Sequence, residues 1–124
     1  MLQMDKTKIL VIDDEEEICQ LTKSFLSKKD YLVLTAISES EAIGLIKKEQ
    51  PHLALLDMRL GDASGLDILK KIKEIDKNIK VIMVTALDDE ESIRQAKSLG
   101  AEAYITKPFS AGYLIDLLSK NITV

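Results

Sequence analysis

The sequence has little of what stabilises a small secreted domain. It contains a single cysteine, Cys19, and no tryptophan. One cysteine forms no internal disulfide, which is typical of proteins in a reducing cytoplasm. A run of about 18 apolar residues, long enough to cross a membrane, is also missing. We therefore expect a cytoplasmic protein that does not associate with membranes.

An excess of positive charge is missing as well. The 17 Lys and Arg residues are outnumbered by 21 Asp and Glu residues, and the net charge is -4. Nucleic-acid-binding domains present a basic surface to phosphates, so direct binding of nucleic acid by this chain is not expected. Hydrophobic residues make up 46% of the 124 residues, enough for one core. The expectation is a single globular domain over residues 1–124.

Short apolar runs alternate with segments of helical periodicity along the chain. The expected strands are residues 8–12, 31–36, 53–57, 81–85 and 103–106. The expected helices are residues 15–28, 38–50, 66–76, 90–99 and 110–120. A strand–helix unit repeated five times, with crossovers of helical length, predicts an α/β protein with a doubly wound parallel sheet.

Local signals add detail to these helices. The buried face of the first helix is expected to consist of Ile18, Leu21, Phe25 and Leu26. Ser38 with Glu41 has the spacing of a capping box, and Asp88 with Glu91 resembles it before the fourth helix. Gly100 is expected just after that helix, where a left-handed conformation often ends a helix.

Polar side chains collect at the carboxyl ends of the expected strands. Asp57 ends the third strand, and Asp13 and Asp14 follow the first. Thr85 ends the fourth strand, and Lys107 follows the fifth. Open α/β sheets bind their ligands at this edge, so we expect these side chains to meet there.

Three converging carboxylates repel one another, by about 4 kcal/mol for a pair about 4 Å apart at an effective dielectric near 20. A cation bound among the carboxylates, or protonation of some of them, would relieve this repulsion. A set of oxygen ligands without His or Cys favours Mg²⁺ over zinc, and the small number of protein ligands favours Mg²⁺ over Ca²⁺. A carboxylate beside Mg²⁺ can attack phosphorus and form an aspartyl phosphate. Lys107 and Thr85 could then contact phosphoryl oxygens.

Each of these residues also has an ordinary structural explanation. Asp14 with Glu17 could cap a helix, Asp57 could simply end its strand in a turn, and Lys107 could be a solvated lysine. The functional interpretation is favoured because four separate strands place the required atom types at one end. His52 lies at the opposite end of the third strand, so we expect it to be an exposed strand-start residue.

The chain resembles the receiver domain of two-component response regulators, the CheY-like family. The resemblance lies in residues 9–14, 55–58, 84–86 and 104–109, and it extends from about Lys8 to the last helix. It implies a flavodoxin-like sheet of five parallel strands in the order 2-1-3-4-5, with five helices.

The resemblance also implies residue roles. Asp57 would be the phosphoacceptor. Asp57 and Asp14 would bind Mg²⁺ directly together with the backbone carbonyl of Arg59, while Asp13 would act through a metal-bound water. Gly61 stands where the family often has proline. We expect the glycine to make this loop looser, but no catalytic atom is lost.

The resemblance implies roles for residues on the other strand ends and loops as well. Thr85 and Lys107 would contact the phosphoryl group, and the Lys107–Pro108 peptide would be cis. Tyr104 would be the switch aromatic that moves inward with Thr85, although an ordinary strand aromatic is the alternative. Arg59 and Leu87 would flank the path of the attacking water, and our hypothesis is that they slow self-dephosphorylation.

The implied function is that of a signalling domain rather than an enzyme. The phosphoryl group would come from a sensor histidine kinase or a histidine phosphotransfer protein and would shift an equilibrium between two conformations. The fourth helix, fifth strand and fifth helix would form the output surface, and a homodimer on phosphorylation is one outcome. Three rivals are a pseudo-receiver interaction module, an aspartyl-nucleophile phosphatase and a nucleotide binder. The acids after the first strand argue against the last two.

Overall fold

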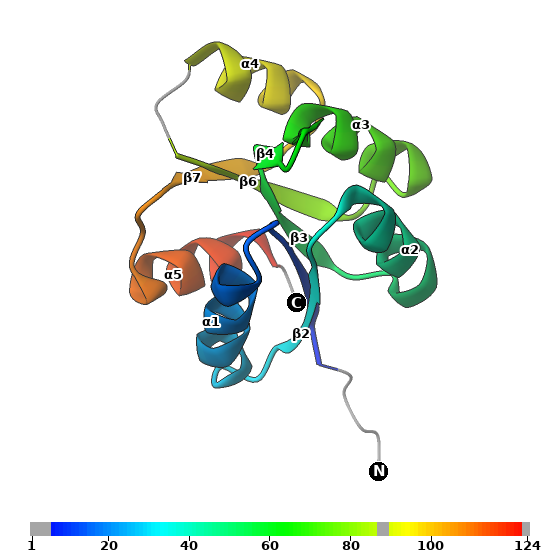
Figure 1. Ribbon diagram of the computed structural model, residues 1–124. Helices are drawn as coiled ribbons and strands as arrows, with labels where there is room; N and C mark the ends of the chain where they lie inside the picture. Colours follow the sequence, from blue (N-terminus) through cyan, green and yellow to red (C-terminus); the bar gives the residue numbers. More distant parts are fainter. Residues whose placement is uncertain (1–5, 87–89, 123–124) are drawn as a thin grey trace.

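The computed structural model describes residues 6–86 and 90–122. Five parallel strands form the central sheet, in the order β2-β1-β3-β6-β7 (Figure 1). They are β1 (Lys8–Ile12), β2 (Leu32–Ala36), β3 (Leu53–Asp57), β6 (Lys80–Thr85) and β7 (Ala103–Thr106). Counted along the chain without a short hairpin after β3, this is the order 2-1-3-4-5. The doubly wound parallel sheet is therefore confirmed.

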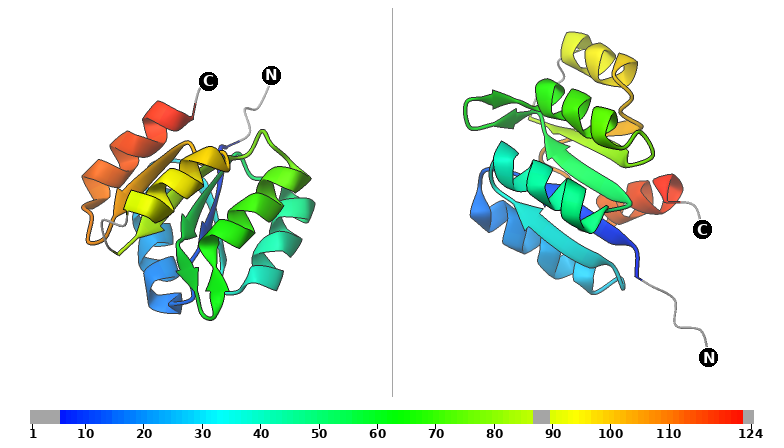
Figure 2. Two further views of the ribbon diagram at one scale, coloured as in Figure 1. Left: turned by 90° about the horizontal axis from the view of Figure 1, so that it is seen from above. Right: turned by 90° about the vertical axis from the view of Figure 1, so that its right-hand side faces the viewer.

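In the described part of the chain, four helices connect the strands of the sheet, a fifth follows the last strand, and together they cover both faces. They are α1 (Glu16–Ser27), α2 (Glu39–Glu49), α3 (Gly65–Ile75), α4 (Glu90–Ser98) and α5 (Ala111–Asn121). Helices α1 and α5 lie on one face, and α2 and α3 lie on the other (Figure 2). None of the helices within the described ranges is long and apolar enough to cross a membrane.

The two faces of the sheet form two separate cores. Ile9 and Val11 of β1 pack against α1 and α5, whereas Leu10 and Ile12 pack against the layer that contains α2 and α3. Buried Ala96 of α4 belongs to this second core. Central strands that are buried on both faces explain why apolar residues are consecutive in these segments rather than alternating.

Helix α1 differs from its predicted packing. The expected apolar face included Leu21, but this side chain is 62% exposed. The buried stripe consists instead of Cys19, Thr22 and Leu26, and Ile18 and Phe25 are only partly buried. Successive residues are about 100° apart on a helix, so Leu21, two positions after Cys19, points away from the sheet.

The signals predicted at the ends of α2 and α4 have mixed outcomes. The Ser38 hydroxyl accepts a hydrogen bond from the Glu41 amide at 3.3 Å, which confirms the cap of α2. Gly100 has a φ of 103° after α4, as expected for a left-handed residue that ends a helix. The proposed Asp88–Glu91 pair cannot be compared with the structure, since Asp88 lies outside the described residues.

The segment between β3 and α3 contains a small hairpin that the sequence did not predict. Strands β4 (Arg59–Leu60) and β5 (Ala63–Ser64) pair antiparallel, where only turn structure was expected. Gly61 turns the chain with a φ of 61°, a conformation that favours glycine. Leu60 is buried and packs the hairpin against the core that contains the buried side chains of α3.

Candidate functional site

Three carboxylates meet at the carboxyl edge of the central strands. Asp13 and Asp14 follow β1, and Asp57 ends the neighbouring strand β3. One carboxylate oxygen from each of them lies within 4.8 Å of the other two. Asp13 is buried, Asp14 is exposed and Asp57 is intermediate, so the cluster opens toward solvent on one side.

Lys107 is the cation of this cluster. It follows β7, and its Nζ lies 2.8 Å from Asp57 Oδ2 and 3.3 Å from Asp13 Oδ2. Its backbone amide donates to the Thr85 carbonyl at 2.7 Å, and the Lys107–Pro108 peptide is cis, as expected. Burial lowers the pKa of Lys107, but the hydrogen bond and charge of Asp57 and the charge of Asp13 outweigh it and raise the pKa.

Backbone amides orient all three carboxylates. Asp57 Oδ1 accepts from the Arg59 amide at 3.0 Å, and Asp13 Oδ1 accepts from the Glu15 amide at 2.9 Å. Asp14 Oδ2 accepts from the Gly61 amide at the tip of the hairpin, also at 2.9 Å. Asp14 therefore does not cap α1, whose N-terminal residue has no side-chain cap.

Asp13 has a perturbed pKa. Burial raises the pKa of this carboxyl, and the negative charge of Asp57 adds to the effect. The Glu15 amide and the charge of Lys107 oppose the shift without cancelling it. The site thus holds a carboxylate that would gain from a bound cation.

The donor set fits Mg²⁺. Within the described residues, Asp13, Asp14 and Asp57 form a group that could hold a metal ion, and all their ligand atoms are oxygen. Magnesium prefers a few carboxylates together with several waters, and the exposed side of the cluster at Asp14 would admit such waters. The arrangement can bind a hard cation next to a carboxylate that is already paired with an ammonium group.

Thr85 lies at the same edge of the sheet, at the end of β6 and next to Val84, the strand partner of Asp57. Its side chain is buried. Tyr104, the expected switch aromatic, stands on β7 opposite Met83 and is 36% exposed. Lys97 Nζ of α4 lies 5.5 Å from the centre of the Tyr104 ring, within the range of a cation–π contact.

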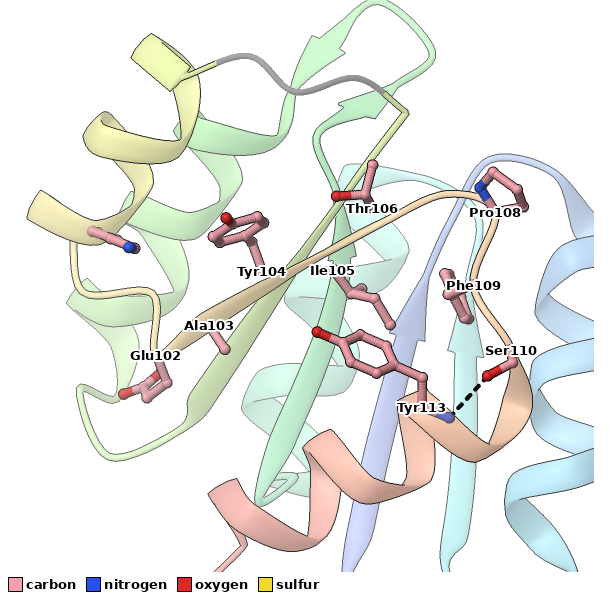
Figure 3. Close-up of a pocket in the computed structure, with 10 residues that line it drawn as sticks. Glu102, Ala103, Tyr104, Ile105, Thr106, Pro108, Phe109, Ser110 and Tyr113 are labelled. Carbon is pink, nitrogen blue, oxygen red and sulfur yellow. Dashed lines mark hydrogen bonds between the residues drawn. The ribbon is translucent and has the colours of Figure 1, made fainter.

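Tyr104 borders an open groove of about 690 Å³ that runs from α4 across β7 to α5. Tyr113 of α5 also lines this groove, and its amide donates to the Ser110 hydroxyl that caps α5 (Figure 3). Phe109 and Pro108 connect the groove to Lys107. Phe109 also lines a small cavity together with Asp13, Asp57 and Lys107, so its side chain borders both the groove and the carboxylate cluster.

Three residues around the site were missed by sequence reasoning. Cys19 is buried in α1, and its thiol donates to the Asp13 carbonyl at 3.3 Å. The Gly61 amide reaches Asp14, and the Gly65 amide donates to the Met58 carbonyl at 2.7 Å. All three contacts involve backbone atoms, which no residue pattern marks. His52, by contrast, is exposed at the start of β3, as expected.

Comparisons with known proteins agree with this geometry. A family model described as the response regulator receiver domain matches residues 9–119. Sporulation initiation phosphotransferase F of Bacillus subtilis (strain 168) is 37% identical over 119 residues, which cover 96% of each chain. The probable transcriptional regulator ycf27 of Porphyridium aerugineum is 37% identical over 107 residues. That match covers 86% of this chain and 44% of the regulator, so the chain spans less than half of this second relative.

Solved structures show the same fold. A CheY-like response regulator receiver domain protein from Methanospirillum hungatei JF-1 superposes with a TM-score of 0.91 at 32% identity, covering 94% of both chains. The BeF3-activated DrrB receiver domain superposes with a TM-score of 0.84 at 31% identity, covering 94% of this chain and 97% of that one. The sheet order, the carboxylate cluster and these matches together show that the chain belongs to the family of response regulator receiver domains.

Proposed function

We propose that this domain accepts a phosphoryl group on Asp57 from a phosphohistidine, in a Mg²⁺-dependent reaction. The donor would be a sensor histidine kinase or a histidine phosphotransfer protein. The observation that carries the proposal is the position of the Asp57 carboxylate, within 4.8 Å of two other acids and 2.8 Å from an ammonium. Such a group is oriented, paired with a cation and close to the solvent-exposed side of the cluster.

In the proposed reaction, one carboxylate oxygen of Asp57 attacks phosphorus while the bond from phosphorus to the imidazole nitrogen breaks. The imidazole leaves with the electron pair and takes a proton. Asp14, Asp57 and the Arg59 carbonyl would hold Mg²⁺ directly, and Asp13 would hold it through a water. When bound, the ion would neutralise charge on the transferred phosphoryl oxygens.

The protein's own side chains supply the remaining contacts. Lys107 already lies on Asp57 Oδ2, so it would follow the new phosphoryl group and pair with one of its oxygens. Thr85 would donate a hydrogen bond to a second oxygen. The Arg59 amide keeps Asp57 Oδ1 in place before the reaction. Lys107 and the Arg59 amide are already in position before the phosphoryl group arrives, which favours transfer.

The output would run from Thr85 through Tyr104 to the groove between α4 and α5. Within the described part of α4, Ile93 and Ala96 are its buried residues, so this helix is held by few apolar contacts. Movement of Thr85 toward a phosphoryl group would leave space for the Tyr104 ring and change the groove. Tyr104→Ala should leave phosphorylation intact and abolish the change in the groove; an unaltered output would contradict this route.

The domain would not turn over a separate substrate; it would assist only its own phosphorylation and dephosphorylation. We propose that residues 1–124 form one such domain, since the family match already covers residues 9–119. A pseudo-receiver would lack a functional acceptor, whereas here the acids and Lys107 are in contact. A phosphatase of the aspartyl-nucleophile type would need its nucleophile at the end of β1 in an Asp-x-Asp pattern, which this chain does not have.

The test is chemical phosphorylation with acetyl phosphate, followed by intact-mass spectrometry. The wild type with Mg²⁺ should gain one phosphoryl group, and chelation of the metal should prevent this. Asp57→Asn should gain none, and Asp14→Asn should react much more slowly. Equal modification of Asp57→Asn, or undiminished modification without metal, would overturn the proposal.

Dimer formation on phosphorylation stays a prediction. Sedimentation with Mg²⁺, in the presence and absence of beryllofluoride as a mimic of the aspartyl phosphate, measures it directly. A shift from monomer to dimer would support association through the output surface. A monomer under both conditions would contradict it, provided that Asp57→Asn shows a loss of beryllofluoride binding that the wild type retains.

A further inference from the structure

Gly65 begins α3 and lies against the backbone that carries Asp57. Its amide donates to the Met58 carbonyl at 2.7 Å. The Met58 amide in turn donates to the Val84 carbonyl of β6 at 2.8 Å. Met58, the residue that follows Asp57, is therefore held at its amide by the neighbouring strand and at its carbonyl by the first residue of α3.

A side chain does not fit at position 65. A Cβ atom on Gly65 would lie 2.4 Å from the Asp57 carbonyl oxygen and 2.8 Å from both Cα and the carbonyl oxygen of Met58. All three are backbone atoms, so none can rotate aside as the end of a flexible side chain would. An ordinary contact of 3.4 Å with the Asp57 oxygen would require a movement of about 1 Å.

The need for glycine here is one of space rather than of backbone conformation. Gly61 and Gly100 have positive φ values of 61° and 103°, whereas Gly65 has no such conformation and starts a regular helix. Gly61 would meet no atom within 4 Å if it carried a Cβ. A substitution at Gly65 would therefore act by displacing the Asp57 backbone, not by straining its own.

We propose that Gly65 is a positioning residue for the acceptor carboxylate, an inference that rests on the function proposed above. The Asp57 side chain makes short contacts, 2.8 Å to Lys107 and 3.0 Å to the Arg59 amide. Mg²⁺ demands near-ideal octahedral geometry, so a ligand displaced with its backbone binds the ion poorly. A misplacement of about 1 Å in a reacting group can slow a reaction about 100-fold.

The test compares Gly65→Ala with the matched control Gly44→Ala. Gly44 is exposed within α2, and a Cβ there would meet nothing within 4 Å. For each folded variant, the rate constant for phosphorylation by acetyl phosphate and the Mg²⁺ dissociation constant are measured beside the thermal unfolding curve.

We expect Gly65→Ala to slow phosphorylation about 10- to 100-fold and to weaken Mg²⁺ binding, while Gly44→Ala matches the wild type. A merely structural role would lower the melting temperature and leave both constants of the folded protein unchanged. That result would overturn the inference. If the wild type itself failed to bind Mg²⁺ or accept phosphate, the proposed function would be wrong instead.

A measurement on the wild type decides the question if Gly65→Ala does not fold. Backbone NMR reports the Gly65 amide, which donates to the carbonyl of the residue next to Asp57. Adding Mg²⁺ and beryllofluoride should shift this resonance and slow its hydrogen exchange, with no change at the Gly44 amide. A Gly65 amide that does not respond would overturn the inference.

Discussion

Buried charge is the main feature of the site at the scale of single residues. Asp13 is 4% exposed, and its proposed role beside Mg²⁺ requires the ionised form. Its raised pKa shows that the folded state disfavours this charge, with burial as the first cause and Asp57 as a further one. The contact of Lys107 Nζ with Asp13 Oδ2 at 3.3 Å offsets part of the free energy that burial of this charge requires.

Asp13→Asn should stabilise the metal-free protein at neutral pH. A carboxyl whose folded pKa is raised favours folding at low pH, and this contribution is lost as pH rises through the folded pKa. The advantage of the variant should therefore be small below about pH 4 and grow above it. Urea unfolding of both proteins across this pH range measures the difference.

Added Mg²⁺ should reduce the advantage of Asp13→Asn, because the wild type gains more from the cation. A variant that is less stable than the wild type at neutral pH without metal would contradict this account. Asp116→Asn is a control, since that carboxylate lies on α5 and pairs with Lys120 at the surface.

Cys19 should be unreactive in the native protein. Burial, followed by the charge of Asp13, raises the pKa of its thiol from 9.0 to about 11. The reactive thiolate is therefore about 100-fold scarcer near neutral pH than in the unfolded chain. We expect alkylation by iodoacetamide to be at least this much slower in native protein than in urea, as followed by mass spectrometry. Comparable rates in both would contradict the observed burial.

Arg59→Asn should shorten the lifetime of the aspartyl phosphate several-fold. The Arg59 side chain is exposed at the start of β4, two residues after the proposed acceptor Asp57, and a smaller side chain would admit water more easily. Leu87, the other residue of this hypothesis, lies outside the described residues. Loss of phosphoryl groups over time measures the lifetime, with Arg94→Asn on α4 as the control. An unchanged lifetime would remove Arg59 from this role.

At the scale of elements, an ion pair joins α3 to the start of β7. Glu102 accepts from the Val81 amide of β6 at 2.7 Å and from Lys73 Nζ at 3.1 Å. Lys73 also donates to the Ile79 carbonyl at 2.6 Å. These bonds hold the end of the α4–β7 connection against the start of β6, at the edge of the sheet opposite the carboxylate cluster.

Glu102→Ala should lower the free energy of unfolding by about 2 kcal/mol, because the part-buried Val81 amide loses its partner. Glu91→Ala is the matched control. Its ion pair with Arg94 is exposed on α4 and should contribute less than about 1 kcal/mol. Chemical denaturation measures both values, and an equal loss of unfolding free energy in the two variants would contradict the importance of the Val81 contact.

Elements differed in how well the sequence predicted them. Strands β1 and β3 were predictable because their central residues form unbroken apolar runs that lead to the acids, which reflects burial on both faces. The β4–β5 hairpin was not, since it consists of two-residue strands with one buried side chain, Leu60. The face of α1 was misjudged because polar Thr22 is buried while Leu21 is exposed.

At the scale of the whole molecule, a doubly wound sheet explains why the acids could be predicted to converge. Parallel strands bring their carboxyl ends to one edge, so strand ends alone indicated Asp13, Asp14 and Asp57 as neighbours. Contacts made by loops and helix starts could not be predicted, as the Gly61 and Gly65 amides show. The Gly61 contact joins segments that are remote in sequence, and the Gly65 contact depends on how the hairpin brings the start of α3 back to the end of β3.

The two-core architecture also places the carboxylate cluster apart from the proposed output surface. The carboxylate cluster lies on the central strands, whose side chains are packed on both faces. The groove at Tyr104 lies at the edge of the sheet, between α4 and α5 (Figure 3). In the proposed function, a change at Asp57 would reach this groove through β6 and β7, while the central strands stay packed on both faces.

The most direct test of the central claim is to identify the phosphorylated residue. The protein is treated with acetyl phosphate and Mg²⁺, the acyl phosphate is reduced with borohydride to homoserine, and the peptides are sequenced by mass spectrometry. The account predicts homoserine at position 57 and its absence when the metal is chelated. Homoserine at position 13 or 14 instead, or at no acidic residue, would contradict it.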